Sequence, residues 1–458
     1  MNTNILQRLQ AIVGTENASI AQADRALHAQ DQSSQPAVMP DYVVWPNSTA
    51  EVSAIVKVAA AHSIPITAWG AGTSLEGHSI PLQKGISLNF QRMNHVVEVH
   101  AEDFQVTVQP GIFRKELEAH LAKFGLMFAP DPGANASIGG MIANNAAGIR
   151  TVKYGATKDN VLALELVLAN GDVVKTGSRS VKQSAGYDLT RLIVGSEGTL
   201  ALVTEATLKL VPIPEHFSTA TVAFPSVDAT AEAVYGIMGS GLEPAALEML
   251  HPTNIEWMNE DAGLDMVVAP SLMMEFSGAS EIAVTEAINM AQEICADAGS
   301  LGFSGGIGRD TRKAMWELRH SLRERSVRTF PGHHWMLVDV AVPISKFPEL
   351  VAYCQNEIDK SGFDGRIIGH AGDGNMHAGI HFLPDDTEAK GRAAQLGTVI
   401  VNRALELGGT CTGEHGIGIG KQKYLIQEHG ETALEMMRII KQSLDPNNLL
   451  NPGKVVPI

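Results

Sequence analysis

The order of apolar and polar positions predicts short strands and helices that follow one another along the first half of the chain. Runs rich in β-branched and aromatic residues predict strands at residues 42–45, 65–69, 85–90, 96–100, 105–109, 163–168, 172–175 and 200–210. Apolar positions at helical spacing predict helices at residues 1–30, 49–61 and 114–124. Asn170-Gly171, between two of the strands, predicts a hairpin turn.

After Pro214 the pattern becomes that of a separate α+β domain. Strands are predicted at residues 219–224, 272–276, 337–342, 365–368 and 378–382, and helices at residues 229–238, 282–298, 310–325 and 387–407. Residues 302–308 are predicted to be a glycine-rich loop, and residues 444–454 a turn-rich tail. With 458 residues, the chain is expected to hold two to four domains of about 150 residues each.

The charge and the cysteine positions argue against several classes of protein. The formal net charge is 34 − 50 = −16, which is unfavourable for a broad nucleic-acid-binding face. Three widely spaced cysteines indicate no disulfide framework and fit a reducing compartment, so we expect a cytoplasmic protein. Residues 1–14 lack the apolar run of a secretory signal, and no run approaches the roughly 18 apolar residues of a membrane span.

The strongest chemical signal is a pair of histidines around a Gly-Asp-Gly turn, in Gly369-His370-Ala371-Gly372-Asp373-Gly374-Asn375-Met376-His377. The predicted strands on either side would bring His370 and His377 to one end of a sheet. Glu414, in Gly413-Glu414-His415-Gly416, offers a carboxylate oxygen. Two imidazoles and a carboxylate, with one position left open, are what a catalytic zinc ion requires. The competing interpretation is that both histidines only cap polar loop ends.

A second signal is the glycine-rich loop Gly70-Ala71-Gly72-Thr73-Ser74-Leu75-Glu76-Gly77, which follows the predicted strand 65–69. It does not match a nicotinamide dinucleotide fingerprint, because Leu75 stands where the third glycine or an alanine is expected. Its successive backbone N–H groups favour an anion-binding nest, which the Thr73 and Ser74 hydroxyls would complete as a pyrophosphate cradle. The small residues of 133–155 would let backbone approach a flat ligand, although tight packing between elements selects the same residues; Asn144 and Asn145 favour the ligand.

Taken in order, these stretches resemble the FAD-binding domain of the vanillyl-alcohol-oxidase/p-cresol-methylhydroxylase flavoproteins. The matching motifs are residues 65–77, Asp131-Pro132-Gly133, Asn144-Asn145-Ala146-Ala147-Gly148, Tyr154-Gly155 and Gly195-Ser196-Glu197-Gly198-Thr199. In the second half, residues 339–345, 369–377, 410–418 and 450–454 look like the branch that holds FAD-dependent D-lactate dehydrogenases, glycolate oxidase flavin subunits and D-2-hydroxyglutarate dehydrogenases. The resemblance covers nearly the whole chain.

The resemblance implies an α+β fold with an FAD-binding domain of the p-cresol-methylhydroxylase type and a second, substrate-binding cap domain built on an antiparallel sheet. Its implied divisions are an N-terminal helical segment at residues 1–40, the FAD-binding domain at 41–214, the substrate- and metal-binding cap at 215–415, and a segment at 416–458 that returns to the FAD domain.

The resemblance also implies where FAD binds. The residues matching the diphosphate site are Gly70, Ala71, Gly72, Thr73, Ser74, Leu75 and Gly77. Those matching the isoalloxazine and ribityl site are Pro132, Gly133, Gly139, Gly140, Asn144, Gly148 and Tyr154. Glu197 and Gly198 would lie near the adenosine half, and Asn451 and Lys454 would return to the flavin domain. We expect non-covalent FAD, because Trp69 and Ala71 cannot form the covalent bond made by some members; His78 remains as a candidate for one.

The catalytic roles follow from the same resemblance. His370, His377 and Glu414 match the ligands of a divalent metal, for which Zn²⁺ is favoured and Mn²⁺ and Fe²⁺ are compatible. His415 matches a general base, with an orienting role as the alternative. Arg319 matches the arginine that binds the substrate carboxylate. The alternative for Arg319 is a solvated basic face shared with Arg312, Arg323, Arg325 and Arg328.

Three departures from the hydroxyglutarate branch indicate the substrate. Where that branch has Thr, Lys and Asn, this chain has Arg323, Leu337 and Gly379, so a second carboxylate loses its partners. We therefore expect oxidation of a small D-2-hydroxy acid, D-lactate first, with hydride to flavin N5 and electrons on to a quinone or cytochrome. The alternatives are a glycolate oxidase flavin subunit, a D-2-hydroxyglutarate dehydrogenase, a metal-dependent hydrolase and a non-catalytic flavin-binding protein. A homodimer and peripheral contact with the inner membrane are left open.

Overall fold

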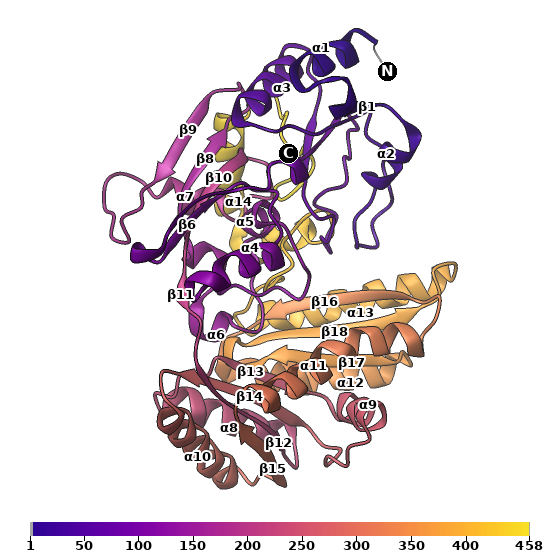
Figure 1. The fold of residues 1–458 in the computed structure, drawn as a ribbon. Helices are drawn as coiled ribbons and strands as arrows, with labels where there is room; N and C mark the ends of the chain where they lie inside the picture. Colours follow the sequence, from indigo (N-terminus) through magenta and orange to yellow (C-terminus); the bar gives the residue numbers. More distant parts are fainter. Residues whose placement is uncertain (1–2, 458) are drawn as a thin grey trace. The chain divides into compact units, whose positions relative to one another are not determined.

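The structure is a computed structural model that describes residues 3–457, and the chain folds into two compact units (Figure 1). The first unit contains the chain up to Ala147, Gly155–Ile213, and the chain from Glu414 onward. The second contains Gly148–Tyr154 and Pro214–Gly413. Among the described residues, no helix has the length and apolar composition needed to cross a membrane.

Two sheets build the first unit. One has the order β1-β2-β4-β3, and the other has the order β5-β6-β10-β8-β9. The strands of the first sheet are β1 (Ala18–Ser19), β2 (Tyr42–Val44), β3 (Ile66–Trp69) and β4 (Ile86–Asn89). The strands of the second are β5 (Val96–His100), β6 (Gln105–Val108), β8 (Val161–Val167), β9 (Val173–Gly177) and β10 (Leu202–Lys209), while β7 (Leu126–Met127) pairs with β11 (Val211–Pro212). The helices are α1 (Thr3–Val13), α2 (Gln22–Leu27), α3 (Thr49–Ala61), α4 (Arg114–Leu121), α5 (Ile138–Asn144), α7 (Leu189–Ile193) and α14 (Leu425–Leu444).

Two features of this unit follow from local sequence, and the second of them, the hairpin, confirms its prediction. Ser48 caps α3 by accepting a hydrogen bond from the backbone N–H of Glu51. Strands β8 and β9 pair antiparallel around the Asn170-Gly171 turn. The predicted helix at residues 1–30 is wrong as a single element, because β1 separates α1 from α2 and pairs with β2; residues 1 and 2 lie outside the described part of the chain.

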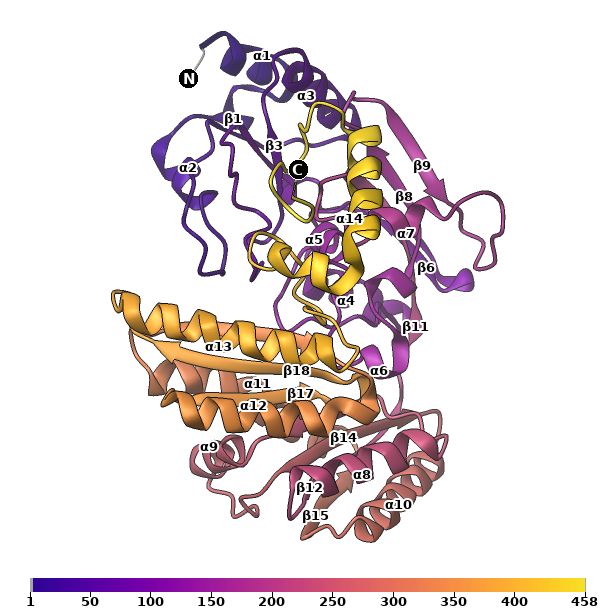
Figure 2. The same ribbon diagram turned by 180° about the vertical axis from the view of Figure 1, so that it is seen from behind.

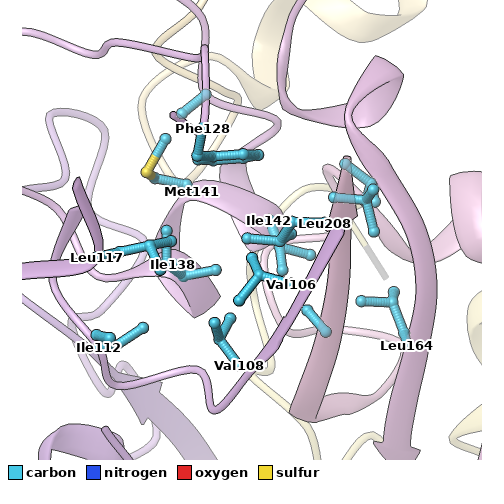
Figure 3. Close-up of a cluster of buried hydrophobic side chains, with 14 of the residues drawn as sticks. Val106, Val108, Ile112, Leu117, Phe128, Ile138, Met141, Ile142, Leu164 and Leu208 are labelled. Carbon is cyan, nitrogen blue, oxygen red and sulfur yellow. The ribbon is translucent and has the colours of Figure 1, made fainter. Parts of the chain in front are cut away.

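The second sheet of this unit packs on α4 and α5 through a buried apolar cluster (Figure 3). Val106 and Val108 of β6 face Leu117 of α4, and Ile138 and Ile142 lie on α5. All five side chains are fully buried, and each such side chain stabilises the fold by about 1.5–3 kcal/mol. This packing places the start of α5 beside the loops that follow β3 and β6.

One antiparallel sheet with the order β15-β12-β14-β13-β17-β18-β16 builds the second unit. Its strands are β12 (His216–Ala223), β13 (Ala246–Leu250), β14 (Ser271–Gly278), β15 (Gly302–Ile307), β16 (His334–Ala341), β17 (Gly365–His370) and β18 (Asn375–Phe382). Its helices are α6 (Thr151–Tyr154), α8 (Val227–Gly239), α9 (Pro252–Ala262), α10 (Glu281–Asp297), α11 (Arg309–Thr329), α12 (Phe347–Ser361) and α13 (Thr387–Glu406). Helices α9 and α11 cover one face of the sheet (Figure 1), and α8, α10, α12 and α13 cover the other (Figure 2).

The glycine-rich loop predicted at residues 302–308 is wrong, since Gly302–Ile307 forms β15 at the edge of this sheet. A Cβ atom on Gly305 would lie 2.6 Å from the carbonyl oxygen of Thr219 on β12. The glycines therefore mark close backbone approach between two strands, a role that glycine has in strands as well as in turns.

Candidate functional site

The predicted histidine hairpin forms within the second unit. Strands β17 and β18 pair antiparallel and are joined at the Gly-Asp-Gly turn. The rings of His370 and His377 are buried, and their centroids lie 5.2 Å apart. Gly374 closes the turn with φ = 68°, and a Cβ atom there would lie 2.0 Å from the carbonyl oxygen of Val342. Only glycine meets both conditions, so the turn that brings the two imidazoles together depends on this residue.

A buried acid that the sequence analysis did not single out contacts the first histidine. Glu248 on β13 lies directly opposite His370 in the strand register, and its Oε1 is 2.5 Å from His370 Nδ1. Its other oxygen accepts a hydrogen bond of 2.8 Å from Nη2 of Arg319. Burial alone would raise the pKa of Glu248, but its hydrogen bonds and electrostatic interactions with His370 and Arg319 hold the pKa below its usual value. The signal in the sequence was a lone glutamate inside the apolar run Ala246-Leu247-Glu248-Met249-Leu250.

The second histidine also has a buried acid beside its Nδ1 atom. Asp339 on β16 lies opposite His377, with Oδ1 3.5 Å from His377 Nδ1. The same carboxylate accepts hydrogen bonds of 2.7 Å from Asn375 Nδ2 and 2.8 Å from Thr412 Oγ1. A carboxylate at Nδ1 favours the tautomer with the proton there, which leaves the lone pair on Nε2 for a ligand. A buried carboxylate thus lies beside Nδ1 of each histidine, and Nε2 is the atom of each ring that would bind a ligand.

Arg319 lies on the sheet-facing side of α11, whereas the other arginines of that helix take different positions. Its side chain is 14% exposed and pairs with Glu248. Arg325 and Arg328 both pair with Asp261 on α9, and Arg323 is exposed. A solvated basic face therefore describes Arg323 and Arg328 but does not describe Arg319.

Leu337 and Gly379 lie opposite each other, two residues along their strands from the Asp339–His377 pair and therefore on the same face of the sheet. A Cβ atom on Gly379 would lie 2.0 Å from Nε1 of Trp335. The indole therefore occupies the space next to Gly379 that any larger side chain would need. Trp335, like Glu248, was absent from the predicted site, because only the strand register brings it there.

Glu414 and His415 are the first residues of the chain after the second unit, and they belong to the first unit. Asn144 Nδ2 donates a hydrogen bond of 2.8 Å to the carbonyl oxygen of Glu414. His415 Nε2 lies 3.6 Å from Glu414 Oε1. Of the expected metal ligands, the second unit thus brings His370 and His377 together, and Glu414 follows where the chain leaves that unit.

The glycine-rich loop after β3 offers unpaired donors. Among residues 3–457, no backbone carbonyl accepts a hydrogen bond from the N–H groups of residues 71–75. Gly72 has φ = 67°, and a Cβ atom there would lie 2.5 Å from the Trp69 ring. A Cβ atom on Gly70 would lie 2.2 Å from Ser137 Oγ. Gly70 and Gly72 thus pack closely against side chains of the first unit, and the amides of the loop can still donate hydrogen bonds to a ligand. This arrangement suits an anion-binding nest.

The other predicted flavin residues fall into three groups. In the first unit, Pro132, Gly133, Gly139, Gly140 and Asn144 lie around the start and along α5, and nothing lies within 4 Å of a Cβ atom placed on Gly133. Gly148 and Tyr154 belong to the second unit. The third group, Glu197, Gly198, Asn451 and Lys454, belongs to the first unit, near its C-terminal segment.

Members of this last group hold backbone segments together. Glu197 is buried and accepts hydrogen bonds from the backbone N–H groups of Ile417 and Gly418, at 2.7 and 2.9 Å. Asn451 Nδ2 and Lys454 Nζ both donate to the carbonyl oxygen of His78, each at 3.0 Å. Burial lowers the pKa of Lys454 to about 8. These side chains fix the loop that follows His415 and the segment around His78.

Comparisons with known proteins identify the two halves of the chain. Residues 40–177 match the family model described as an FAD binding domain, and residues 213–455 match the C-terminal domain of FAD linked oxidases. The chain is 41% identical over 455 residues to the mitochondrial D-lactate dehydrogenase [cytochrome] of Arabidopsis thaliana, covering 99% of this chain and 80% of the relative. It is 36% identical over 456 residues to the glycolate oxidase subunit GlcD of Bacillus subtilis, covering 99% and 96%.

Among solved structures, p-cresol methylhydroxylase with substrate bound aligns with a TM-score of 0.80, at 19% identity, over 98% of this chain and 96% of that one. This likeness shows the fold. The expected α+β fold of the p-cresol-methylhydroxylase type is therefore confirmed.

Proposed function

The chain belongs to the FAD-linked oxidases, and from this premise we propose that it oxidises a small D-2-hydroxy acid, D-lactate first, to the 2-oxo acid. The observation that carries the proposal is the histidine pair in the second unit, with a buried carboxylate at each Nδ1 atom. Histidines that bind a metal commonly have a carboxylate beside the ring nitrogen that does not bind it.

The FAD-binding residues of the first unit fit the cofactor. No backbone carbonyl among residues 3–457 accepts from the amides of residues 71–75, and these donors suit a diphosphate, since a half-buried N–H group without an acceptor is unfavourable. The open space beside Gly133 suits a flat ring system. When bound, FAD accepts the two electrons and the hydrogen released from C2 of the substrate. We propose non-covalent binding, because the His78 imidazole is buried with Nε2 3.2 Å from Glu197 Oε1.

The cation would be held by His370, His377 and Glu414. Gly413 packs on the histidine hairpin, since a Cβ atom there would lie 2.1 Å from Asn375 Nδ2 and 3.0 Å from Asp339 Oδ1. Glu414 follows by one peptide bond, so its Cα atom is about 3.8 Å from that of Gly413. Zn²⁺ is favoured by this ligand set, and Mn²⁺ and Fe²⁺ are compatible. When bound, such a cation lowers the pKa of the substrate hydroxyl.

The remaining steps are assigned to residues of the chain. His415 takes the hydroxyl proton as general base. Arg319 binds the substrate carboxylate: Nη2 is engaged by Glu248, but the buried Nε has no hydrogen-bond partner within residues 3–457 and is available as a donor. Leu337, Gly379 and Trp335 offer an apolar surface to the substrate side chain, which suits a methyl group better than a second carboxylate.

We propose a cytochrome as electron acceptor, by analogy with the Arabidopsis relative, and a quinone as the alternative. The cytoplasm is the proposed location, with peripheral contact at the inner membrane if the acceptor is a quinone; a homodimer is compatible with either. A glycolate oxidase flavin subunit is the second candidate function, and the GlcD relative supports it. The support for D-2-hydroxyglutarate is exposed Arg323, which would have to receive the distal carboxylate.

Anaerobic reduction of the bound flavin tests the proposal directly. D-Lactate should bleach the absorbance near 450 nm faster than glycolate or D-2-hydroxyglutarate, and L-lactate should leave it unchanged. Prior treatment with a chelator should slow bleaching by about 10³-fold, and added Zn²⁺ or Mn²⁺ should restore it. Fastest bleaching by glycolate would favour the second candidate. A colourless protein that binds zinc would contradict the redox role altogether.

A further inference from the structure

We propose that Glu248 is a positioning residue that fixes the ring of His370 for a divalent cation, with Arg319 as its counter-charge. The inference rests on the proposed cation site and adds a residue to it that no sequence motif contains. It concerns only the second unit, to which Glu248, Arg319 and His370 all belong.

Both oxygens of the buried Glu248 carboxylate have a partner. The side chain is 0% exposed, so water cannot solvate the carboxylate. Each oxygen has its own partner: Oε1 contacts His370 Nδ1, and Oε2 accepts from Arg319 Nη2. A buried carboxylate between two cationic or donor groups cannot rotate without breaking one of these contacts. The His370 ring is therefore held in one orientation through Nδ1.

The contact with Glu248 determines which ring nitrogen of His370 can bind a cation. With Nδ1 as the donor to Glu248, Nε2 carries the lone pair and can bind a cation. His377 lacks an equally close contact. Asp339 Oδ1 lies 3.5 Å from His377 Nδ1, and the same carboxylate already accepts hydrogen bonds from Asn375 and Thr412. The acid contact at His370 is 1.0 Å shorter than that at His377 (3.5 − 2.5), so we expect Glu248 to contribute more to cation binding than Asp339.

A second buried glutamate beneath the same helix binds an arginine without contacting either histidine of the proposed cation site. Glu275 on β14 is also buried beneath α11, where it pairs with Arg312 at 2.8 Å and with Trp316. Two acids on neighbouring strands thus each bind an arginine of the same helix, yet only Glu248 also contacts a metal-ligand candidate. Removing either acid breaks an ion pair between α11 and the sheet. Of the two changes, only the removal of Glu248 should alter the cation site.

The test measures cation affinity in the full-length protein after chelation and dialysis. Zn²⁺ affinity is obtained by competition with a fluorescent zinc chelator for wild type, Glu248→Gln and Glu275→Gln. The amide keeps the size of the side chain and removes its charge. We expect Glu248→Gln to bind Zn²⁺ about 10–100-fold more weakly than wild type, and Glu275→Gln to bind within about twofold of it.

A second readout separates ligand orientation from stability. The visible spectrum of bound Co²⁺ reports coordination geometry, so it should change in Glu248→Gln and stay as in wild type in Glu275→Gln. If Glu248→Gln does not fold, Glu248→Asp keeps the charge but withdraws it from Nδ1, and the same loss is expected. Equal Zn²⁺ affinity and unchanged Co²⁺ spectra in the Glu248 variants would overturn the inference and leave the cation site standing. A wild-type protein that binds neither ion would overturn the proposed site, and the inference with it.

Discussion

At the scale of single residues, His381 illustrates how a buried imidazole links the fold to pH. Its ring stacks on Phe330 with centroids 4.3 Å apart, and Nε2 lies 3.0 Å from Ser326 Oγ on α11. Burial, and then the positive charges of Arg366 and His333, lower the pKa of His381 to about 4. The folded state therefore favours the neutral form of the His381 ring.

The sign of the pH effect follows from this shift. Below pH 6.5 the unfolded chain gains a proton that the folded state does not gain until about pH 4. The shifted pKa of His381 therefore does not reduce the free energy of unfolding above pH 6.5. As the pH falls from 6.5 to about 4, it reduces the free energy of unfolding by at most about 3 kcal/mol. Urea unfolding of wild type and His381→Gln at pH 7 and pH 4.5 measures this loss. The free energy of unfolding should fall less in the variant than in wild type between pH 7 and pH 4.5. The exposed control His62→Gln should behave as wild type, and an equal loss in all three would contradict the prediction.

A second residue-scale prediction concerns Trp335. The indole occupies the space beside Gly379, so Trp335→Leu should admit a longer substrate side chain. We expect the ratio of kcat/KM for D-2-hydroxyvalerate to that for D-lactate to rise about 10-fold, as for one or two methylene groups in an apolar pocket. Met336→Leu, one residue along β16 and on the opposite face, is the control and should leave the ratio unchanged. A ratio that moves equally in both variants would show that Trp335 does not limit substrate size.

At the scale of elements, the β17–β18 hairpin depends on the conformation of one glycine. Gly374→Ala must accept φ = 68° and must also push away the carbonyl oxygen of Val342, 2.0 Å from the new Cβ atom. Gly332→Ala is the matched control, because φ is 76° there and nothing lies within 4 Å. We expect the control to lose about 1–2 kcal/mol and Gly374→Ala about 3 kcal/mol or more, measured by chemical unfolding. Similar losses would mean that the turn can relax around the added methyl group.

The same hairpin shows which elements a sequence can predict. Its two strands and turn are confirmed, because Gly-Asp-Gly between apolar runs is a local signal. Strand β15 was missed because its glycines are explained only by the close approach of β12. Strand β13, and Glu248 with it, was missed because its position opposite His370 is set by pairing across more than a hundred residues. Local chemistry is readable in the sequence, and strand register between distant segments is not.

At the scale of the whole molecule, the net charge of −16 bears on the electron acceptor. An acidic protein attracts a basic partner over distances near the Debye length, which is about 10 Å at 0.1 M salt. We expect the rate of reduction of a basic cytochrome c to fall about 10-fold between 20 and 200 mM NaCl. The rate with a neutral quinone analogue should change by less than about twofold over the same range. Equal salt dependence with both acceptors would show that charge does not guide the encounter.

The C-terminal segment has a consequence for synthesis on the ribosome. Leu450 bridges to Ile66 on β3, the edge strand of the first sheet, and buried Lys441 donates to the carbonyl oxygen of Thr199 at 2.8 Å. At about 5–20 residues per second, a nascent β3 must wait roughly 20–80 seconds for that partner to be translated. An unprotected strand edge is a template for aggregation. The first unit begins at the start of translation but cannot be completed until the C-terminal segment has been made. A chaperone that shields the growing chain should therefore raise the yield of active protein.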